Sequence, residues 1–171
     1  MIGSKPKPKV GISACLLGCG VRYDGGNKRQ AWLVRALGKA VTFIPVCPEL
    51  ECGLGVPREP MRLTGNPASP RLVVIRTGKD VTAQMRRWMR RRLDELEGQN
   101  PCGFVFKSKS PSCGVRDVGI FDKRGKPLAK GAGLFARAFR CRFAGAPVAD
   151  EQRLQDAKKR RAFINRVLGY G

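Results

Sequence analysis

The stretch KVGISACLLG, residues 9–18, ends a short apolar run with a cysteine, Cys15. Two later stretches repeat this arrangement: VTFIPVCPEL, residues 41–50, contains Cys47, and CGFVFKSKSPSCG, residues 102–114, contains Cys113. Each run has the length and the composition of a buried strand. The carboxyl ends of parallel strands meet at one edge of a sheet, where ligands bind. The three cysteines therefore predict one shared site at that edge.

Strand patterns alternate with helical patterns along the chain, which predicts an α/β fold: Rossmann-like, with a mainly parallel sheet flanked by helices. We expect a flexible basic tail over residues 1–8 and a single domain over residues 9–171. Residues 48–70 hold five prolines and are expected to form a long irregular loop or a pair of short turns. The expected strands cover 9–14, 41–46, 71–77, 102–108 and 146–150, with a further short strand within 118–133, and the expected helices cover 29–40, 78–98, 133–143 and 151–169.

The chain contains seven cysteines and no histidine among its 171 residues. The missing histidine excludes His-based triads, His-ligated zinc and a His general base. No apolar run approaches the ~20 residues of a membrane span, and the N-terminus lacks a signal-peptide pattern. We therefore expect a cytoplasmic protein without membrane contact, whose cysteines serve metal, cluster or redox chemistry or are simply buried.

The formal net charge is +21, from 34 Lys and Arg against 13 Asp and Glu. A charge of this size favours contact with a polyanion, RNA first, or describes an enzyme with a basic surface. RRWMRRR, residues 86–92, and KKRR, residues 158–161, are the densest basic runs. Such runs usually form solvated helix faces, and no RNA-binding motif accompanies them.

The spacing of the cysteines does not by itself identify a metal site. Zinc sites and ferredoxin-type clusters usually contain a local C-x-x-C pair, and none occurs here. Cys15 and Cys19 lie four residues apart, and Cys47 and Cys52 lie five apart. A three-thiolate site assembled from separate strand ends therefore stands beside the alternative that these cysteines are ordinary buried residues.

Several motifs together resemble a bacterial family whose characterised members are thiouracil desulfidases. They are GISACLLG, VRYDGGNK, PVCPELECGLGVPREPMRL, TGKD, FVFKSKSPSCG and GAGLFA, in this order over roughly residues 9–140. The resemblance implies a [4Fe-4S] cluster held by three cysteines, with one iron lacking a protein ligand. By motif, the ligands resemble Cys15, Cys47 and Cys113, the catalytic acid resembles Glu49, and the catalytic serine resembles Ser110.

The implied chemistry is a hydrolytic desulfuration of thiolated pyrimidines, in which 2- or 4-thiouracil gives uracil and sulfide. An open iron suits a soft thiocarbonyl sulfur. Glu49 would activate water or carry a proton to a ring nitrogen, and Ser110 would deliver or orient a proton. A carboxylate in this role agrees with the absence of histidine.

Other residues near these motifs have open roles. We name Tyr23, Asp24 and Ser112 as candidate substrate-binding residues, although Asp24 could equally cap its own turn. Asn27 stands where many relatives are expected to have histidine, which argues against a catalytic role at this position. The remaining cysteines are expected to be buried or incidental: Cys19, Cys52, Cys102 and Cys141.

The sequence leaves two alternatives to the free thiolated base as substrate. Related domains fused to another module act on thiolated tRNA bases, so 4-thiouridine in tRNA is the second enzyme reading. The third hypothesis is a non-catalytic protein that binds zinc or a cluster and binds nucleic acid through its Arg-rich helix. A complete fourth ligand would favour the third reading, because a closed site cannot bind sulfur. The oligomeric state is left open.

Overall fold

The computed structural model describes residues 6–170, and its first layer is a sheet of four parallel strands. The strand order is β2-β1-β5-β8. Gly11 of β1 faces the ring of Phe104 on β5, and a Cβ atom at this glycine would lie 2.1 Å from the ring. The strands are β1 (Lys9–Ser13), β2 (Thr42–Val46), β5 (Phe104–Phe106) and β8 (Val148–Asp150). The predicted α/β fold with a mainly parallel sheet is confirmed.

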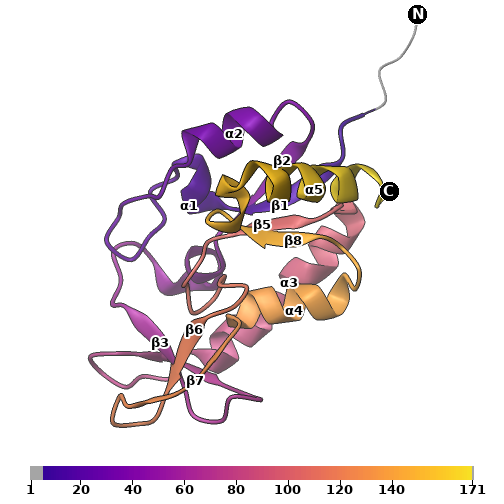
Figure 1. Cartoon of the computed structure of the whole chain (residues 1–171). Coiled ribbons are helices and arrows are strands. Elements are labelled where there is room, and N and C mark those ends of the chain that lie inside the picture. Colours follow the sequence, from indigo (N-terminus) through magenta and orange to yellow (C-terminus); the bar gives the residue numbers. More distant parts are fainter. Residues whose placement is uncertain (1–5, 171) are drawn as a thin grey trace, which may run out of the picture.

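Helices cover both faces of this sheet (Figure 1). Phe104 and Phe106 of β5 pack in one apolar cluster with residues of α3 (Thr82–Gln99) and α4 (Leu134–Arg142). Val105, between them, packs in a second cluster with residues of α2 (Ala31–Leu37) and α5 (Ala157–Leu168). The alternation of side chains along a strand therefore divides the core into two halves.

A second sheet, of mixed direction, was not predicted. Its strand order is β4-β3-β6-β7, with β3 and β6 parallel and both outer strands antiparallel to their neighbours. The strands are β3 (Met61–Thr64), β4 (Arg71–Val74), β6 (Val118–Phe121) and β7 (Pro127–Gly131). The expectation of a long irregular loop or a pair of short turns over residues 48–70 is wrong for β3, which is a strand. The segment does contain a helical turn, η1 (Leu50–Leu54).

The remaining differences between the expected and the observed elements concern where helices begin and end. A short helix, α1 (Ala14–Leu17), follows β1 directly and ends at Gly18, whose φ of 102° places it in the left-handed region. The last helix begins at Ala157 and not at 151, because the Asp156 side chain caps it by accepting from the Lys159 amide. The turn η2 (Arg153–Gln155) precedes it.

The predicted tail over residues 1–8 falls largely on residues 1–5, which lie outside the described residues. Residues 6–8 form no helix or strand, although the Pro8 carbonyl accepts from the Thr42 amide at 2.9 Å. None of the helices in residues 6–170 combines the length and the apolar character that a membrane crossing requires.

Candidate active site

A cavity of about 390 Å³ lies where the carboxyl ends of the parallel strands meet the second sheet. Its wall includes Ser13 and Val46, which end β1 and β2, and Met61, which begins β3. The loop that follows β5 forms another part of the wall, with residues 107–111 and Cys113. The cavity is therefore at the position that the topology of a parallel α/β sheet assigns to a ligand site.

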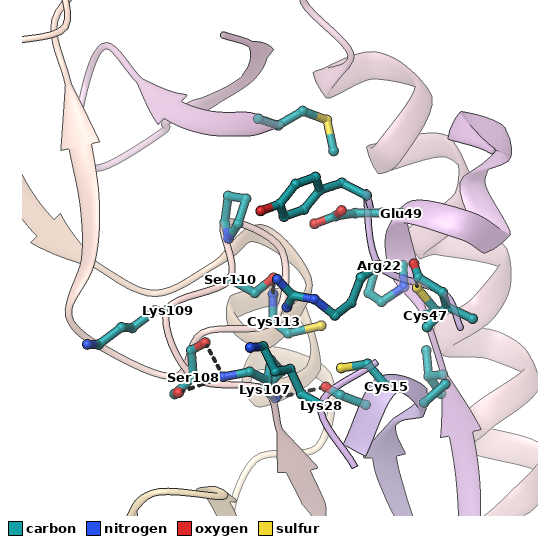
Figure 2. Close-up of a pocket in the computed structure, with 18 of the residues that line it drawn as sticks. Cys15, Arg22, Lys28, Cys47, Glu49, Lys107, Ser108, Lys109, Ser110 and Cys113 are labelled. Atoms are coloured by element: carbon teal, nitrogen blue, oxygen red, sulfur yellow. Dashed lines mark hydrogen bonds between the residues drawn. The ribbon is translucent and has the colours of Figure 1, made fainter. Parts of the chain in front are cut away.

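All three predicted cysteines line this cavity (Figure 2). Cys47 follows β2 directly, Cys15 lies in the first turn of α1, and Cys113 comes seven residues after the end of β5. Figure 2 shows the sulfur atoms of Cys15 and Cys113 turned toward each other, with Cys47 beside them. The expectation that each cysteine directly follows its strand holds for Cys47 alone, but the expected convergence is present.

Cys47 is held by a local helical turn. Pro48 occupies the first helical position. Proline suits this position, because an N–H group there would have no hydrogen-bond partner within the helix. The Glu51 carboxylate reaches back and accepts from the Cys47 amide at 2.8 Å. Arg92 of α3 pairs with Glu51 at 3.2 Å, so the longest helix of the chain fixes the turn that carries Cys47.

Burial raises the pKa of each of the three thiols. The pKa of Cys15 is raised to about 11, chiefly by burial and then by the charge of Cys47, while Lys107 and Arg22 oppose the shift. Burial is also the largest cause for Cys47 and for Cys113, and the pKa of Cys113 is further raised by the charges of Cys15 and Glu49. Without a metal the three thiols are protonated at neutral pH, and metal binding has to release their protons.

The donor set fits an iron–sulfur cluster. Three thiols from three segments face one cavity, and cysteine thiolates are the usual ligands of such clusters. Within residues 6–170, no three Cys, Asp or Glu side chains are grouped as the ligands of one metal ion would be. Thiolates that ligate separate irons of a cluster stand farther apart than the ligands of one ion.

Glu49 lines the same cavity, with its side chain 14% exposed. Its Oε2 accepts from Arg58 Nε and Nη2 at 3.0 and 2.6 Å, and its Oε1 accepts from Ser112 Oγ at 3.0 Å. It is the one carboxylate on the cavity wall formed by the described residues. Any acid–base work by a carboxylate in this cavity therefore falls to Glu49.

Ser110 lies on the cavity wall in the loop after β5. Its Oγ accepts from the backbone amides of Ser112 and Cys113 at 3.2 and 3.1 Å. These hydrogen bonds form a turn in the loop that places Cys113 on the cavity wall. They occupy the lone pairs of the hydroxyl and leave its proton free to be donated.

Positive side chains dominate the polar part of the wall. Besides Arg58, the basic residues on it are Arg22, Lys28, Lys107 and Lys109. Figure 2 shows Arg22, Lys28 and Lys107 close to Cys15 and Cys113. The cavity therefore suits an anionic group more than a cationic one.

A buried ion pair, which the sequence did not indicate, fixes the loop after β5. The parallel pairing of β5 with β8 sets Phe106 opposite Asp150, so Lys107 and Ser108 leave the sheet beside Glu151. Glu151 accepts from Lys107 Nζ at 2.5 Å and from the Ser108 amide and hydroxyl at 2.8 and 2.6 Å. These bonds hold the start of the loop that carries Ser110 and Cys113.

Replacement of Glu151 by alanine is expected to destabilise the protein by about 3–5 kcal/mol, because it leaves the Lys107 ammonium buried without its partner. The side chains of Glu151 and Lys107 are only 5% and 17% exposed. Urea unfolding of wild type and variant at matched iron content measures the difference. The double variant Lys107→Met/Glu151→Leu should recover much of the loss, and equal losses in both would contradict the account.

The same pair predicts a dependence of stability on pH. Burial alone would raise the pKa of Glu151, but the hydrogen bonds from Lys107 and Ser108 outweigh it and hold the pKa below the ordinary value of 4.5. The stabilisation is therefore complete above about pH 4.5 and is lost as the pH falls through the lowered pKa. Glu151→Gln should lose less stability than wild type over that acidic range.

The structure places the remaining predicted residues as follows. Tyr23 lines the cavity. Asp24 does not: its carboxylate is half exposed, accepts from the Gly26 amide and pairs with Arg22. Ser112 is fully buried behind the wall and donates to Glu49. Asn27, outside the wall, caps the Arg29 amide. Cys102 is buried, Cys52 is half-buried, and Cys19 and Cys141 are exposed.

Comparison with known proteins agrees with the motifs. A family model described as 2-thiouracil desulfurase matches residues 10–151. The chain is 29% identical over 150 residues to the "Uncharacterized protein YbbK" of Bacillus subtilis (strain 168), across 85% of this chain and 97% of that protein. A solved structure of the "[4Fe-4S]-dependent thiouracil desulfidase TudS" is similar with a TM-score of 0.70 and 34% identity, across 91% of this chain and 99% of that one.

The matched span contains every cysteine on the cavity wall, together with Glu49 and Ser110. It also contains the α3 and α4 side of the core and the whole second sheet, whereas α5 lies beyond its end. The resemblance that the sequence motifs indicated is confirmed at the level of the family and of the fold. This chain belongs to the 2-thiouracil desulfurase family.

Proposed function

We propose that this protein is an enzyme that removes sulfur from thiolated pyrimidines, converting 2- or 4-thiouracil to uracil and sulfide. The observation that carries the proposal is the convergence of three cysteines, Glu49 and Ser110 on one cavity, in a family with a thiouracil desulfidase among its structural relatives. We place the reaction in the cytoplasm, because all seven cysteines are free and free thiols persist in a reducing compartment.

Cys15, Cys47 and Cys113 are the ligands that we propose for a [4Fe-4S] cluster. With three thiolate ligands, one iron lacks a protein ligand and would supply Lewis-acid chemistry suited to a soft thiocarbonyl sulfur. The thiols give up their protons when they bind iron. Lys107 and Arg22 partly offset the rise that burial causes in the pKa of Cys15, and Arg58 partly offsets it for Cys47.

Glu49 acts as the general base in this proposal. Oε1 has one hydrogen bond, from Ser112, and can accept a proton from a water molecule in the cavity. That water supplies the oxygen that attacks the carbon of the C=S group. Glu49 can then return the proton to a ring nitrogen of the pyrimidine.

Ser110 acts as a proton donor. The two amides that donate to its Oγ would stabilise the oxygen after the proton has left. Its place on the cavity wall brings the hydroxyl within the space that a bound pyrimidine would fill. Ser110 and Glu49 therefore provide a donor and an acceptor to one substrate.

The proposed reaction is a hydrolysis without net electron transfer. The C=S bond breaks, a C=O bond forms with an oxygen from water, and sulfur leaves as sulfide. Anaerobic turnover of 4-thiouracil in H₂¹⁸O, followed by mass spectrometry of the product, tests this balance. Uracil carrying one ¹⁸O atom is the expected product, and unlabelled uracil would contradict the hydrolytic route.

A second candidate substrate is 4-thiouridine in tRNA, which the basic wall and the net charge of +21 favour. A base in folded RNA must leave its stack before it can enter a cavity. The positive side chains around the thiols would then contact the phosphates next to that base. The Arg-rich face of α3, with Arg86, Arg87, Arg90 and Arg91 exposed, is the other surface that could bind RNA.

RNA binding predicts a steep dependence on salt. The affinity for thiolated tRNA is expected to fall about 10- to 100-fold between 50 and 200 mM salt, because phosphate contacts release counterions. Turnover of free 4-thiouracil should change little over the same range. Lys28→Gln/Lys109→Gln should weaken tRNA binding more than Arg90→Gln/Arg91→Gln if the cavity side is the RNA surface. A salt-independent or undetectable affinity would remove tRNA as a substrate.

A further inference from the structure

Arg58 lies in the GVPREP segment, beside Glu49 on the cavity wall, with its side chain only 7% exposed. Its Nε and Nη2 both donate to Glu49 Oε2. The rest of the guanidinium group is fixed by two carbonyl groups: Nη1 donates to Gly55 O at 2.9 Å, and Nη2 donates to Val21 O at 3.0 Å. The guanidinium group is therefore held in one orientation by contacts on three sides.

The hydrogen bonds to Glu49 leave one acceptor site of its carboxylate unoccupied. A carboxylate offers about four lone-pair sites. Arg58 occupies two on Oε2, and the fully buried Ser112 hydroxyl occupies one on Oε1. One site remains, on Oε1. Because Glu49 lines the cavity, that site is the one available to a water molecule or a substrate proton.

We propose that Arg58 is a positioning residue that fixes the Glu49 carboxylate so that this one remaining lone pair serves proton transfer. The inference rests on the proposed function, because it concerns the role of Glu49 in desulfuration. Arg58 itself need not touch the substrate. It acts by removing the rotational freedom of the carboxylate, and misplacement of a reacting group by about 1 Å can cost a factor of about 10² in rate.

Arg58 also joins the segment of Glu49 to the segment of Tyr23. Its backbone amide donates to Tyr23 O at 2.8 Å, and its Nη2 shares Val21 O with the Cys47 thiol. A loss of Arg58 could therefore act through the wall of the cavity and not through Glu49. The two routes differ in their readout, because a displaced Tyr23 changes substrate affinity and a misoriented Glu49 changes kcat.

The first test compares Arg58→Met and Arg58→Lys in iron-loaded protein. In Arg58→Met, kcat for 4-thiouracil is expected to fall about 10²-fold while KM changes less than about threefold. Arg58→Lys keeps the charge and should lose less. Arg76→Met is the matched control, because Arg76 donates from Nε to a carboxylate, that of Glu59, at 2.9 Å on the exposed surface. The control should keep the wild-type kcat.

The decisive test places Arg58→Met in a Glu49→Gln background, where no buried carboxylate is left without a partner. If Arg58 acts through Glu49, the double variant should show a single-turnover rate within about twofold of Glu49→Gln, and an equal equilibrium affinity for 4-thiouracil. A further fall of about 10²-fold, or a loss confined to affinity, would overturn the inference. This variant and Arg58→Lys carry the test even where Arg58→Met alone does not fold.

Failure of the inference and failure of the proposed function give different results. A wild-type protein with a full cluster that desulfurates no thiolated pyrimidine contradicts the proposed function. A wild-type protein that is active, is inactivated by Glu49→Gln and keeps its kcat in both Arg58 variants contradicts the role of Arg58 alone.

Discussion

Replacement of Cys15, Cys47 or Cys113 by alanine is expected to abolish cluster incorporation. Iron should fall from about four atoms per chain to nearly none. A cluster of this type is held by its thiolate ligands, and the two remaining thiols cannot hold it. Activity toward thiouracil should be lost with it. Iron and acid-labile sulfide, measured on anaerobically purified protein, report the effect directly.

Two cysteines away from the cavity are matched controls. Cys102 is buried, as are Cys15 and Cys113, and Cys141 is exposed. Alanine at either position should leave the iron content unchanged, which separates loss of a ligand from loss of a buried thiol. If Cys19 or Cys52 proves essential for iron binding and one of the three cavity cysteines does not, the ligand assignment is wrong.

Glu49→Gln is expected to lower kcat by about 10²- to 10⁴-fold, the usual contribution of a general acid–base group. The amide has nearly the shape of the carboxylate and can still contact Ser112, but it cannot accept a proton. The iron content should stay at the wild-type level, since Glu49 is not a proposed ligand. Steady-state kinetics with 4-thiouracil, together with iron analysis of the same sample, measure both quantities.

Glu59→Gln is the control for this change, because Glu59 carries a comparable contact to an arginine on the surface, outside the cavity wall. Its kcat should match wild type. Wild-type kcat in Glu49→Gln would exclude Glu49 as the base and would transfer that role to a water molecule or a thiol.

The strands of the parallel sheet and the convergence of the three cysteines could be predicted from the sequence. The apolar run in CGFVF is unbroken because Phe104, Val105 and Phe106 are buried on the two faces of the sheet. The order of strands and helices then placed their carboxyl ends together. The assignment of Glu49 and Ser110 to the site came from motifs, and both residues lie on the cavity wall.

The second sheet and the polar network could not be predicted in the same way. The β3 segment, MRLT, is short, contains an arginine and lies among prolines, so no strand pattern identifies it. Lys107 and Glu151 are 44 residues apart, and only the register of β5 against β8 brings them together. Ser112 is a predicted substrate-binding residue. The orientation of its side chain depends on the turn that Ser110 forms by accepting from the Ser112 amide. In this turn the Ser112 hydroxyl donates to Glu49.

The most direct test of the central claim is a single experiment on anaerobically purified protein. Iron and acid-labile sulfide are counted per chain, and the conversion of 4-thiouracil to uracil is then followed together with the release of sulfide. About four irons per chain, with sulfide released in step with uracil, is the result that we predict. Zinc in place of iron, or a complete cluster that is inert toward 2-thiouracil, 4-thiouracil and thiolated tRNA, would contradict it and would favour a non-catalytic nucleic-acid-binding protein.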